Sequence, residues 1–325
     1  MRFMCPVSDR RAIAGVIVVR SDYSEVRWLN GGVALCRDMA RTIDEAFRVL
    51  RTNLEITDLQ EKTVSTRQTS IRSVLESDFI VLDSFLAGSY RRSTMISPLK
   101  EADVDIFVIL DPKYYAAQGQ TGLLNAVRAS LLKTYTKTPK IRPDGHAVTI
   151  TFTDFKVDVV PGFHRKGGGY LIPDTSGPRW IPTDPKRHVE IWSQANRTHN
   201  GDLVPLLKML KGWNASRSLL KSFHLETLAL DILTNVTISS FPSGIRYFFD
   251  KARAKIRTKL ADPAGYSDDV AQHVNTTEQM DTIVKRLDWA LARAQEAEKF
   301  AAAGRTMDAF AKWSQLIPNH FPAYG

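Results

Sequence analysis

An alternating run at 103–110 most constrains the fold of this chain, because its first two outward positions are both aspartates. The even-numbered positions hold Val, Ile, Val and Leu, while Asp103 and Asp105 occupy the first two odd-numbered positions. An alternation of period two predicts a β-strand with one buried face, so both carboxylates point the same way. Hard oxygen ligands on one side of a rigid strand are typical of a Mg²⁺ site. An isolated Asp-x-Asp tripeptide, however, is more often a solvated strand end.

A third aspartate, Asp158, lies in a second apolar run at 155–160, with a valine on either side of it. A carboxylate in so apolar a segment is costly to bury unless it is paired or coordinates a metal. Alone, Asp158 is also consistent with partnering a buried Arg or Lys. Combined with Asp103 and Asp105, it predicts a three-carboxylate metal site. A pair of ions in such a site can clamp the entering and leaving oxygens of a phosphoryl or nucleotidyl transfer.

A glycine and a serine precede the acidic strand and suit contacts with phosphate. Gly88 and Ser89 follow the apolar segment 79–86, and a basic polar segment, 91–94, comes directly after them. Glycine has no Cβ, so backbone N–H groups beside it can approach a phosphate oxygen closely. The segment is neither a Walker loop nor a Rossmann fingerprint, because the required spacings are missing. Gly-Ser alone is an ordinary turn, but after a buried strand it predicts a phosphate-binding turn.

The chain resembles the DNA polymerase β-like nucleotidyltransferase superfamily in the order of the Gly88-Ser89 turn, the acidic strand at 103–105 and Asp158. Within that superfamily it is similar to the bacterial cGAS/DncV-like nucleotidyltransferases, the oligonucleotide cyclases of anti-phage signalling systems. The resemblance runs from about Met39 to the C-terminus. Three further segments support the narrower resemblance, at 86–94, 203–214 and 221–226.

The resemblance implies that the three aspartates bind metal and that the turn binds phosphate. Asp103, Asp105 and Asp158 would hold two Mg²⁺ ions, for which Mn²⁺ could substitute. Asp158 would also help to activate the attacking hydroxyl. Gly88 and Ser89 would cradle the triphosphate of a bound nucleotide.

The resemblance also implies nucleotide contacts from residues further along the chain. Lys208 and Ser222 would contact the β- and γ-phosphates, Phe223 would stack on the donor base, and Arg92 would join the nucleotide-binding set. A structural interpretation stays open for most of these residues. The apolar residues of 203–214 recur at spacings of three and four, which is typical of a core-facing helix with solvated lysines. Phe223 is equally consistent with a plain core position.

The order of elements and the resemblance together predict an α+β fold. A polymerase β-like nucleotidyltransferase lobe with a mixed sheet is expected at 39–183, and a C-terminal helical bundle lobe that closes the active-site cleft is expected at 184–325. Strands are expected at 79–86, 103–110, 147–152 and 155–160. Helices are expected at 39–54, 60–76, 122–134, 185–199, 202–214, 222–239, 244–258, 275–299 and 304–315.

The first 38 residues match nothing downstream and show no sustained period. We expect 1–38 to lie outside the catalytic fold, as an extension that is loosely ordered or not native, with Met39 as a candidate translation start. A short strand at 14–19 that adds to the sheet edge is the alternative. The segment holds both cysteines, Cys5 and Cys36, so the chain has no disulfide framework.

The net charge of +9 favours polyanionic ligands, including nucleotides. Surface lysines that maintain solubility would give the same charge. No apolar run approaches the ~20 residues that a membrane helix needs, so we expect a cytoplasmic protein with no membrane partner.

By resemblance, the expected enzyme joins nucleoside triphosphates, ATP among them, into a cyclic di- or trinucleotide, and this product activates a partner effector. Nucleic acid is not required. One alternative is a nucleotidyltransferase that acts on RNA or makes linear 2′-5′ oligoadenylate, although no Arg-rich tract supports it. Another is a non-catalytic nucleotide sensor, although such a sensor is expected to lack a metal-binding carboxylate.

Overall fold

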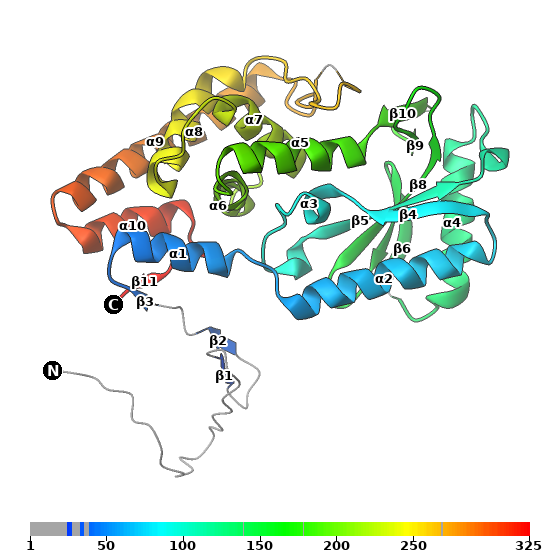
Figure 1. Cartoon of the computed structure of the whole chain (residues 1–325), viewed down its shortest axis with the longest axis horizontal. Helices are drawn as coiled ribbons and strands as arrows, with labels where there is room; N and C mark the ends of the chain where they lie inside the picture. The colour runs from blue at the N-terminus through cyan, green and yellow to red at the C-terminus, as the bar shows by residue number, and fades with distance from the viewer. Residues whose placement is uncertain (1–24, 28–32, 36–38, 139, 178, 268) are drawn as a thin grey trace, which may run out of the picture.

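The computed structural model describes residues 25–27, 33–35 and 39–325, apart from 139, 178 and 268. Within this part of the chain, the strands around the predicted aspartates belong to a seven-stranded mixed sheet, and helices follow it toward the C-terminus (Figure 1). The predicted α+β fold is confirmed.

Strand β8 (Lys156–His164) joins three other strands of this sheet. Along one edge it pairs in parallel with β5 (Asp103–Leu110). Along the other edge it pairs antiparallel, first with β7 (Ala147–Thr151) and then with β9 (Tyr170–Asp174). Three further strands pair antiparallel with members of this group. Strand β4 (Val81–Leu86) pairs with β5, β6 (Lys140–Asp144) pairs with β7, and β10 (Arg179–Thr183) pairs with β9.

Helices α2 (Asp58–Glu76) and α4 (Gln120–Thr134) cover one face of the sheet (Figure 1). The even-numbered side chains of β5 enter the apolar cluster between these helices and the sheet. Val104, Ile106 and Val108 are all fully buried there. Burying each such side chain adds about 2 kcal/mol of hydrophobic stabilisation, which holds the even-numbered face of β5 against the helices. Because side chains alternate along a strand, the odd-numbered residues of β5 lie on the other face.

The opposite face of β5 changes in character along the strand. Phe107 enters a second, smaller apolar cluster with Tyr170 of β9 and Phe85 of β4. The rings of Phe85 and Phe107 stack with centroids 5.5 Å apart. Asp103 and Asp105 lie on the same face, before this cluster begins. The face therefore presents two carboxylates beside an apolar floor. Short 3₁₀ turns flank β5, at Leu99–Glu101 and Pro112–Tyr114.

The helices that follow the sheet form another core, around the buried side chains of Trp192, Trp213 and Trp313. Phe47 of α1 (Ile43–Asn53) meets Trp313 with ring centroids 5.0 Å apart, so a segment that precedes the sheet also packs here. The boundary expected at 183 stays a prediction. These helices are α5 (Pro185–Thr198), α6 (Leu203–Ala215), α7 (Ser222–Leu233), α8 (Phe241–Lys255), α9 (Thr277–Ala302) and α10 (Thr306–Leu316). Among the helices of the described chain, none combines the length and apolar character needed to cross a bilayer.

The region predicted as a helix from residue 39 begins with extended backbone instead. Strand β3 (Met39–Ala40) pairs in parallel with β11 (Ala323–Tyr324), close to the C-terminus. Helix α1 begins only after Thr42, whose side chain accepts a hydrogen bond from the Glu45 N–H at 3.1 Å. This cap satisfies an N–H group that has no partner within the helix, so it fixes where α1 starts.

Two short strands near the N-terminus, β1 (Glu25–Arg27) and β2 (Val33–Leu35), pair antiparallel with each other. The strand suggested at 14–19 and most of the 1–38 extension lie outside the described residues.

Candidate active site

The register between β5 and β8 brings the predicted aspartates together near the end of the sheet where both strands begin. We call this end, with Asp103, Asp105 and Asp158, the aspartate edge. Asp105 and Asp158 are direct Cα partners on these adjacent parallel strands, and Asp103 is opposite Lys156. Neighbouring strands lie about 4.8 Å apart, so the Asp105 and Asp158 side chains emerge side by side. On the other edge of β8, Thr149 of β7 is opposite Asp158 and donates its hydroxyl to Oδ1 of Asp158 at 2.6 Å.

Burial and mutual repulsion act on the two central carboxyl groups. Burial raises the pKa of Asp105 to about 7, and the negative charge of Asp158 adds to the shift. Burial also raises the pKa of Asp158, against the hydrogen bond from Thr149, which lowers it. Among the described residues, no Lys or Arg forms an ion pair with either group. Two adjacent carboxylates without a cation between them resist ionisation, which is the electrostatic setting that a divalent cation relieves.

Asp103 lies at the same edge but has a different partner. Its carboxylate pairs with Lys156 at 3.5 Å, and each of these side chains is 51% exposed. In the part of the chain that the structure describes, no three His, Cys, Asp or Glu side chains are gathered as a metal-binding group. An exposed ion pair of this kind contributes at most about 1 kcal/mol, so turning Asp103 toward its neighbours is inexpensive.

The predicted phosphate-binding turn lies directly against Asp105. Gly88 begins the four-residue helix α3 (Gly88–Arg91) and adopts a φ of +58°, a left-handed conformation that favours glycine. A Cβ at this position would overlap the Asp105 carboxylate. The Ala87 N–H donates to the Asp105 carbonyl at 2.9 Å and fixes the turn to β5. The carbonyl of Ser89 accepts from two backbone N–H groups further along the turn. Gly88, Ser89 and the aspartates are thus brought together.

Arg92 does not face the aspartate edge as a free cation. Its Nε donates to Oε2 of Glu226 at 2.9 Å, and Lys211 of α6 donates to Oε1 of the same carboxylate at 3.1 Å. All three side chains are buried. Burial alone would raise the pKa of Glu226, but Lys211 and Arg92 lower it to about 2. Both cations also act to lower the pKa of Asp105, so this triad contributes positive potential at the aspartate edge.

The other predicted nucleotide-binding residues lie in the helical region, and Lys208 and Phe223 have partners of their own there. Lys208 is buried on α6 and pairs with the carboxylate of Glu55. Ser222 is exposed as the first residue of α7. Phe223 is half-buried and stacks on Trp192 with ring centroids 5.9 Å apart. Within the described part of the chain, none of these three side chains forms a hydrogen bond or an ion pair with the aspartates.

Sequence reasoning missed three residues that shape this site, namely Thr149, Lys211 and Glu226. Glu226 had a visible signal, because it is one of two acids in the largely apolar helix 222–233, and an acid in so apolar a segment calls for a buried partner. Lys211 lies three residues after Lys208 on an otherwise apolar helix, a spacing that puts both on neighbouring positions of one face. Thr149 carried no signal, because threonine is common in strands.

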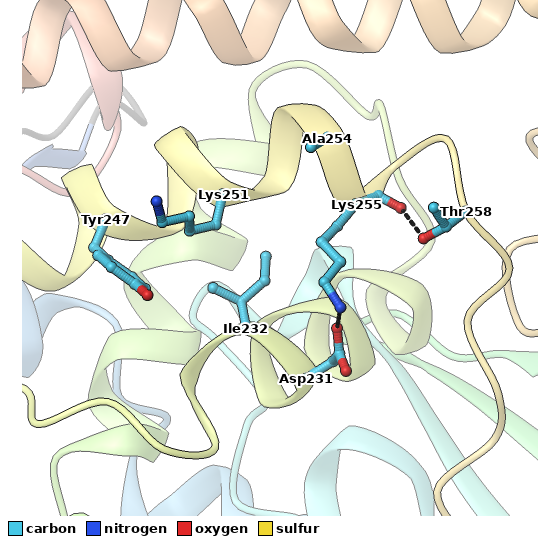
Figure 2. Close-up of a pocket in the computed structure, with 7 residues that line it drawn as sticks. All are labelled: Asp231, Ile232, Tyr247, Lys251, Ala254, Lys255 and Thr258. Carbon is cyan, nitrogen blue, oxygen red and sulfur yellow. Dashed lines mark hydrogen bonds and ion pairs between the residues drawn. The ribbon is translucent and has the colours of Figure 1, made fainter.

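A separate hollow lies between α7 and α8 in the helical region (Figure 2). Lys255 pairs there with Asp231 at 2.8 Å, and the Tyr247 ring lines the opposite side. It shares no residue with the predicted site, so it offers positions for control substitutions.

Residues 41–196 match the sequence model of a Second Messenger Oligonucleotide or Dinucleotide Synthetase domain. A cyclic AMP-AMP-AMP synthase from Acinetobacter sp. is 26% identical over 306 residues, which cover 86% of each chain. Both similarities span the acidic strand, Asp158 and the Gly-Ser turn.

Solved structures share the fold over most of the chain. CdnC from E. coli, solved with ATP, has a TM-score of 0.71 and 17% identity, and the alignment covers 86% of this chain and 99% of CdnC. CdnC has also been solved in complex with HORMA-deltaN, with a TM-score of 0.69, 18% identity and the same coverage. The cyclic AMP-GMP synthase DncV from Vibrio cholerae has a TM-score of 0.59 and 16% identity over 86% of each chain. At these identities the likeness establishes the fold.

Proposed function

We propose that this chain, which carries a Second Messenger Oligonucleotide or Dinucleotide Synthetase domain, joins nucleoside triphosphates into a cyclic di- or trinucleotide and releases pyrophosphate. The chain is a distant homologue of the bacterial cGAS/DncV-like nucleotidyltransferases. The observation that carries the proposal is that Asp105 and Asp158 lie opposite each other on adjacent strands and that Gly88 lies directly against Asp105. The curated relative that makes cyclic AMP-AMP-AMP supports ATP as one substrate.

The donor set at this edge fits a hard divalent cation. Asp105 and Asp158 offer oxygen ligands whose pKa values are raised by burial, so a cation between them would replace a repulsion with an attraction. Asp103 would complete the set by leaving its exposed partner, Lys156. Two Mg²⁺ ions, or Mn²⁺ in their place, supply charge neutralisation for the phosphates and the attacking oxygen when bound.

The residues of the chain would position the nucleotides and hold the proton of the attacking group. Thr149 binds Oδ1 of Asp158, and the carboxylate keeps further lone pairs, on Oδ2 above all, that would accept the proton of a ribose hydroxyl. The hydroxyl oxygen forms a bond to the α-phosphorus as the bond to the bridging oxygen breaks, and pyrophosphate leaves in line. Gly88 and Ser89 would hold the triphosphate through backbone N–H groups and the serine hydroxyl.

Residues of the helical region would complete the nucleotide site. Lys208 would leave the exposed carboxylate of Glu55 and meet the β- and γ-phosphates together with Ser222. Phe223 would stack on the donor base with the part of its ring that Trp192 and Arg92 leave uncovered. Stacking on an aromatic ring contributes about 1–3 kcal/mol per base.

The product would act as a second messenger for an effector in anti-phage signalling. Nucleic acid is not part of the proposed reaction, because the site needs only nucleotides and metal. The complex of CdnC with HORMA-deltaN makes a protein partner worth testing for this chain as well.

The test is to incubate the purified chain with radiolabelled ATP, GTP, CTP and UTP, with Mg²⁺ or Mn²⁺, and to treat the products with phosphatase. A small labelled nucleotide that resists phosphatase is the expected result. Asp103→Asn combined with Asp105→Asn should abolish it in a chain that still folds. Asp231→Asn, in the hollow between α7 and α8, is the matched control and should keep full activity. Labelled RNA, a phosphatase-sensitive oligonucleotide, or bound ATP without any product would contradict the proposal.

A further inference from the structure

Arg92 and Thr94 follow the phosphate-binding turn, and both reach the same carboxylate. Nε of Arg92 donates to Oε2 of Glu226 at 2.9 Å, and both side chains are buried. The Thr94 hydroxyl donates to the carbonyl oxygen of Ser89 at 3.4 Å, and Thr94 also acts to lower the pKa of the Glu226 carboxylate. One buried carboxylate therefore binds Arg92 and lies near Thr94 at the end of the turn.

The residue between these two anchors has an unfavourable backbone conformation. Ser93 adopts a φ of +60°, in the left-handed region that non-glycine residues rarely occupy. Its side chain is exposed, so contacts of that side chain do not account for the conformation. Such backbone persists where neighbouring groups hold it in place. On one side of Ser93, Arg92 is held by Glu226, and on the other, the Thr94 hydroxyl is bound to the Ser89 carbonyl near the same carboxylate.

Glu226 also connects this turn to the helix that carries the predicted phosphate-binding lysine. Lys211 of α6 donates to Oε1 of Glu226 at 3.1 Å. Lys208 lies three residues earlier on the same helix, so it shares a face with Lys211. A single carboxylate on α7 thus sets the spacing between the turn at Ser89 and α6.

We propose that Glu226 is a positioning residue for the triphosphate: it holds the turn at 88–94 in its binding conformation, and Arg92 acts by binding Glu226 and not the phosphates. This inference rests on the proposed function, because it concerns the nucleotide of that same site. It assigns Arg92 and Thr94, two residues of the Gly-Ser segment, to anchoring the turn.

The alternative, in which Arg92 is a phosphate ligand that Glu226 restrains, predicts an effect of opposite sign. Removing the Glu226 charge would then release a cation and remove an anion near the triphosphate, so ATP would bind more tightly. If Glu226 positions the turn, the same change weakens binding. The surroundings favour positioning, because the guanidinium carbon lies 5.3 Å from the Trp192 ring centroid and 5.2 Å from that of Phe223. The guanidinium is thus enclosed by two rings and a carboxylate.

The test measures the dissociation constant of the non-hydrolysable analogue α,β-methylene-ATP, with Mg²⁺, by calorimetry, with circular dichroism as a check of folding. Glu226→Gln should bind the analogue about tenfold or more weakly, which is the effect expected when charge-assisted hydrogen bonds are lost. Thr94→Val should weaken binding in the same direction, and Thr94→Ser, which keeps the hydroxyl, should restore it. Asp231→Asn, on the same helix and in the separate hollow of Figure 2, should bind as the native chain does.

A second variant covers the case in which Glu226→Gln does not fold, since it leaves two buried cations without an anion. Lys211→Met combined with Glu226→Gln keeps the buried net charge of the native triad at +1, because one cation and the carboxylate are removed together. It should also bind the analogue at least tenfold more weakly.

The outcomes separate this inference from the function it rests on. The inference is supported if folded Glu226 variants bind the analogue more weakly and if Thr94→Ser keeps the binding that Thr94→Val loses. Tighter or unchanged binding in those variants, alongside normal binding by the native chain, overturns the inference and leaves the proposed function standing. Failure of the native chain to bind the analogue overturns the proposed function, and this inference with it.

Discussion

Thr149 and Asp158 face each other across β7 and β8, and the threonine hydroxyl donates a 2.6 Å hydrogen bond to Oδ1 of the aspartate. This bond fixes the orientation of the carboxylate and lowers its pKa, against the burial that raises it. It therefore makes the two oxygens of Asp158 unequal, because only Oδ1 accepts this bond.

Thr149→Val should lower the turnover number about 10- to 100-fold, because an outer partner that orients a metal-binding carboxylate typically has an effect of that size. The stability cost should be small, about 1 kcal/mol for one hydrogen bond. Turnover with saturating ATP and Mg²⁺ measures the effect, and Thr149→Ser, which keeps the donor, is the control. Equal turnover in the valine and serine variants would show that the hydroxyl has no role.

The stability of the chain should depend on pH through Asp105. Its folded-state pKa of about 7 lies above the ordinary value of 3.8, so ionisation disfavours the fold. This penalty is complete above about pH 7, declines as the pH falls, and is absent below about pH 4. Asp105→Asn should therefore raise the free energy of unfolding by about 1–3 kcal/mol at pH 8, after allowance for solvent screening, with little difference near pH 4. Urea unfolding without divalent metal measures this, and a variant less stable than the native chain at pH 8 would contradict it.

Lys208 and Glu55 offer a pair of substitutions with different expected effects. Lys208→Ala should raise the KM for ATP about tenfold, because a charge-assisted contact with phosphate is lost. Glu55→Gln should leave this KM unchanged or lower it, because it releases the lysine from a partner that is 46% exposed. Steady-state kinetics distinguish the two. If Lys208→Ala leaves the KM unchanged, the lysine is structural only.

The N-terminal extension should be dispensable, but the residues that follow it should not. Deletion of 1–38 should leave the unfolding midpoint and the product rate unchanged. Deletion through Thr42 should cost about 1–2 kcal/mol more, since it removes the cap of α1 and the pairing of β3 with β11. Thermal unfolding of the two shortened chains makes the comparison. Insolubility or a loss of several kcal/mol on removing 1–38 alone would place that segment in the core.

The aspartate edge was predictable because local pattern determines it. Asp103 and Asp105 alternate with Val104 and Ile106, so burying the apolar face of β5 points both carboxylates the other way. Gly88 was likewise readable as a turn residue, and the structure adds the reason, since a Cβ there would overlap Asp105. The metal and nucleotide roles of these residues stay predictions.

Tertiary partners were not predictable in this way. Arg92 and Glu226 are 134 positions apart in the chain, and only the packing of α7 near the turn decides that they meet. Strands β6, β9 and β10 were missed for a different reason. Each contains a proline, at Pro143, Pro173 and Pro182, and proline argues against a strand in sequence reasoning because it cannot donate to the ladder.

The pairing of β3 with β11 places Met39 and Ala40 beside the last residues of the chain (Figure 1). The Gly325 N–H donates to the Ala40 carbonyl at 3.2 Å, and Nε of Arg41 donates to the Gly325 carbonyl at 3.3 Å. A short linker could therefore join the two ends with little loop entropy to overcome, which makes the protein a candidate for circular permutation. Protein domains fused before Met39 and after Gly325 would also emerge from one point beside α1, so the fold would hold them next to each other although they are far apart in sequence.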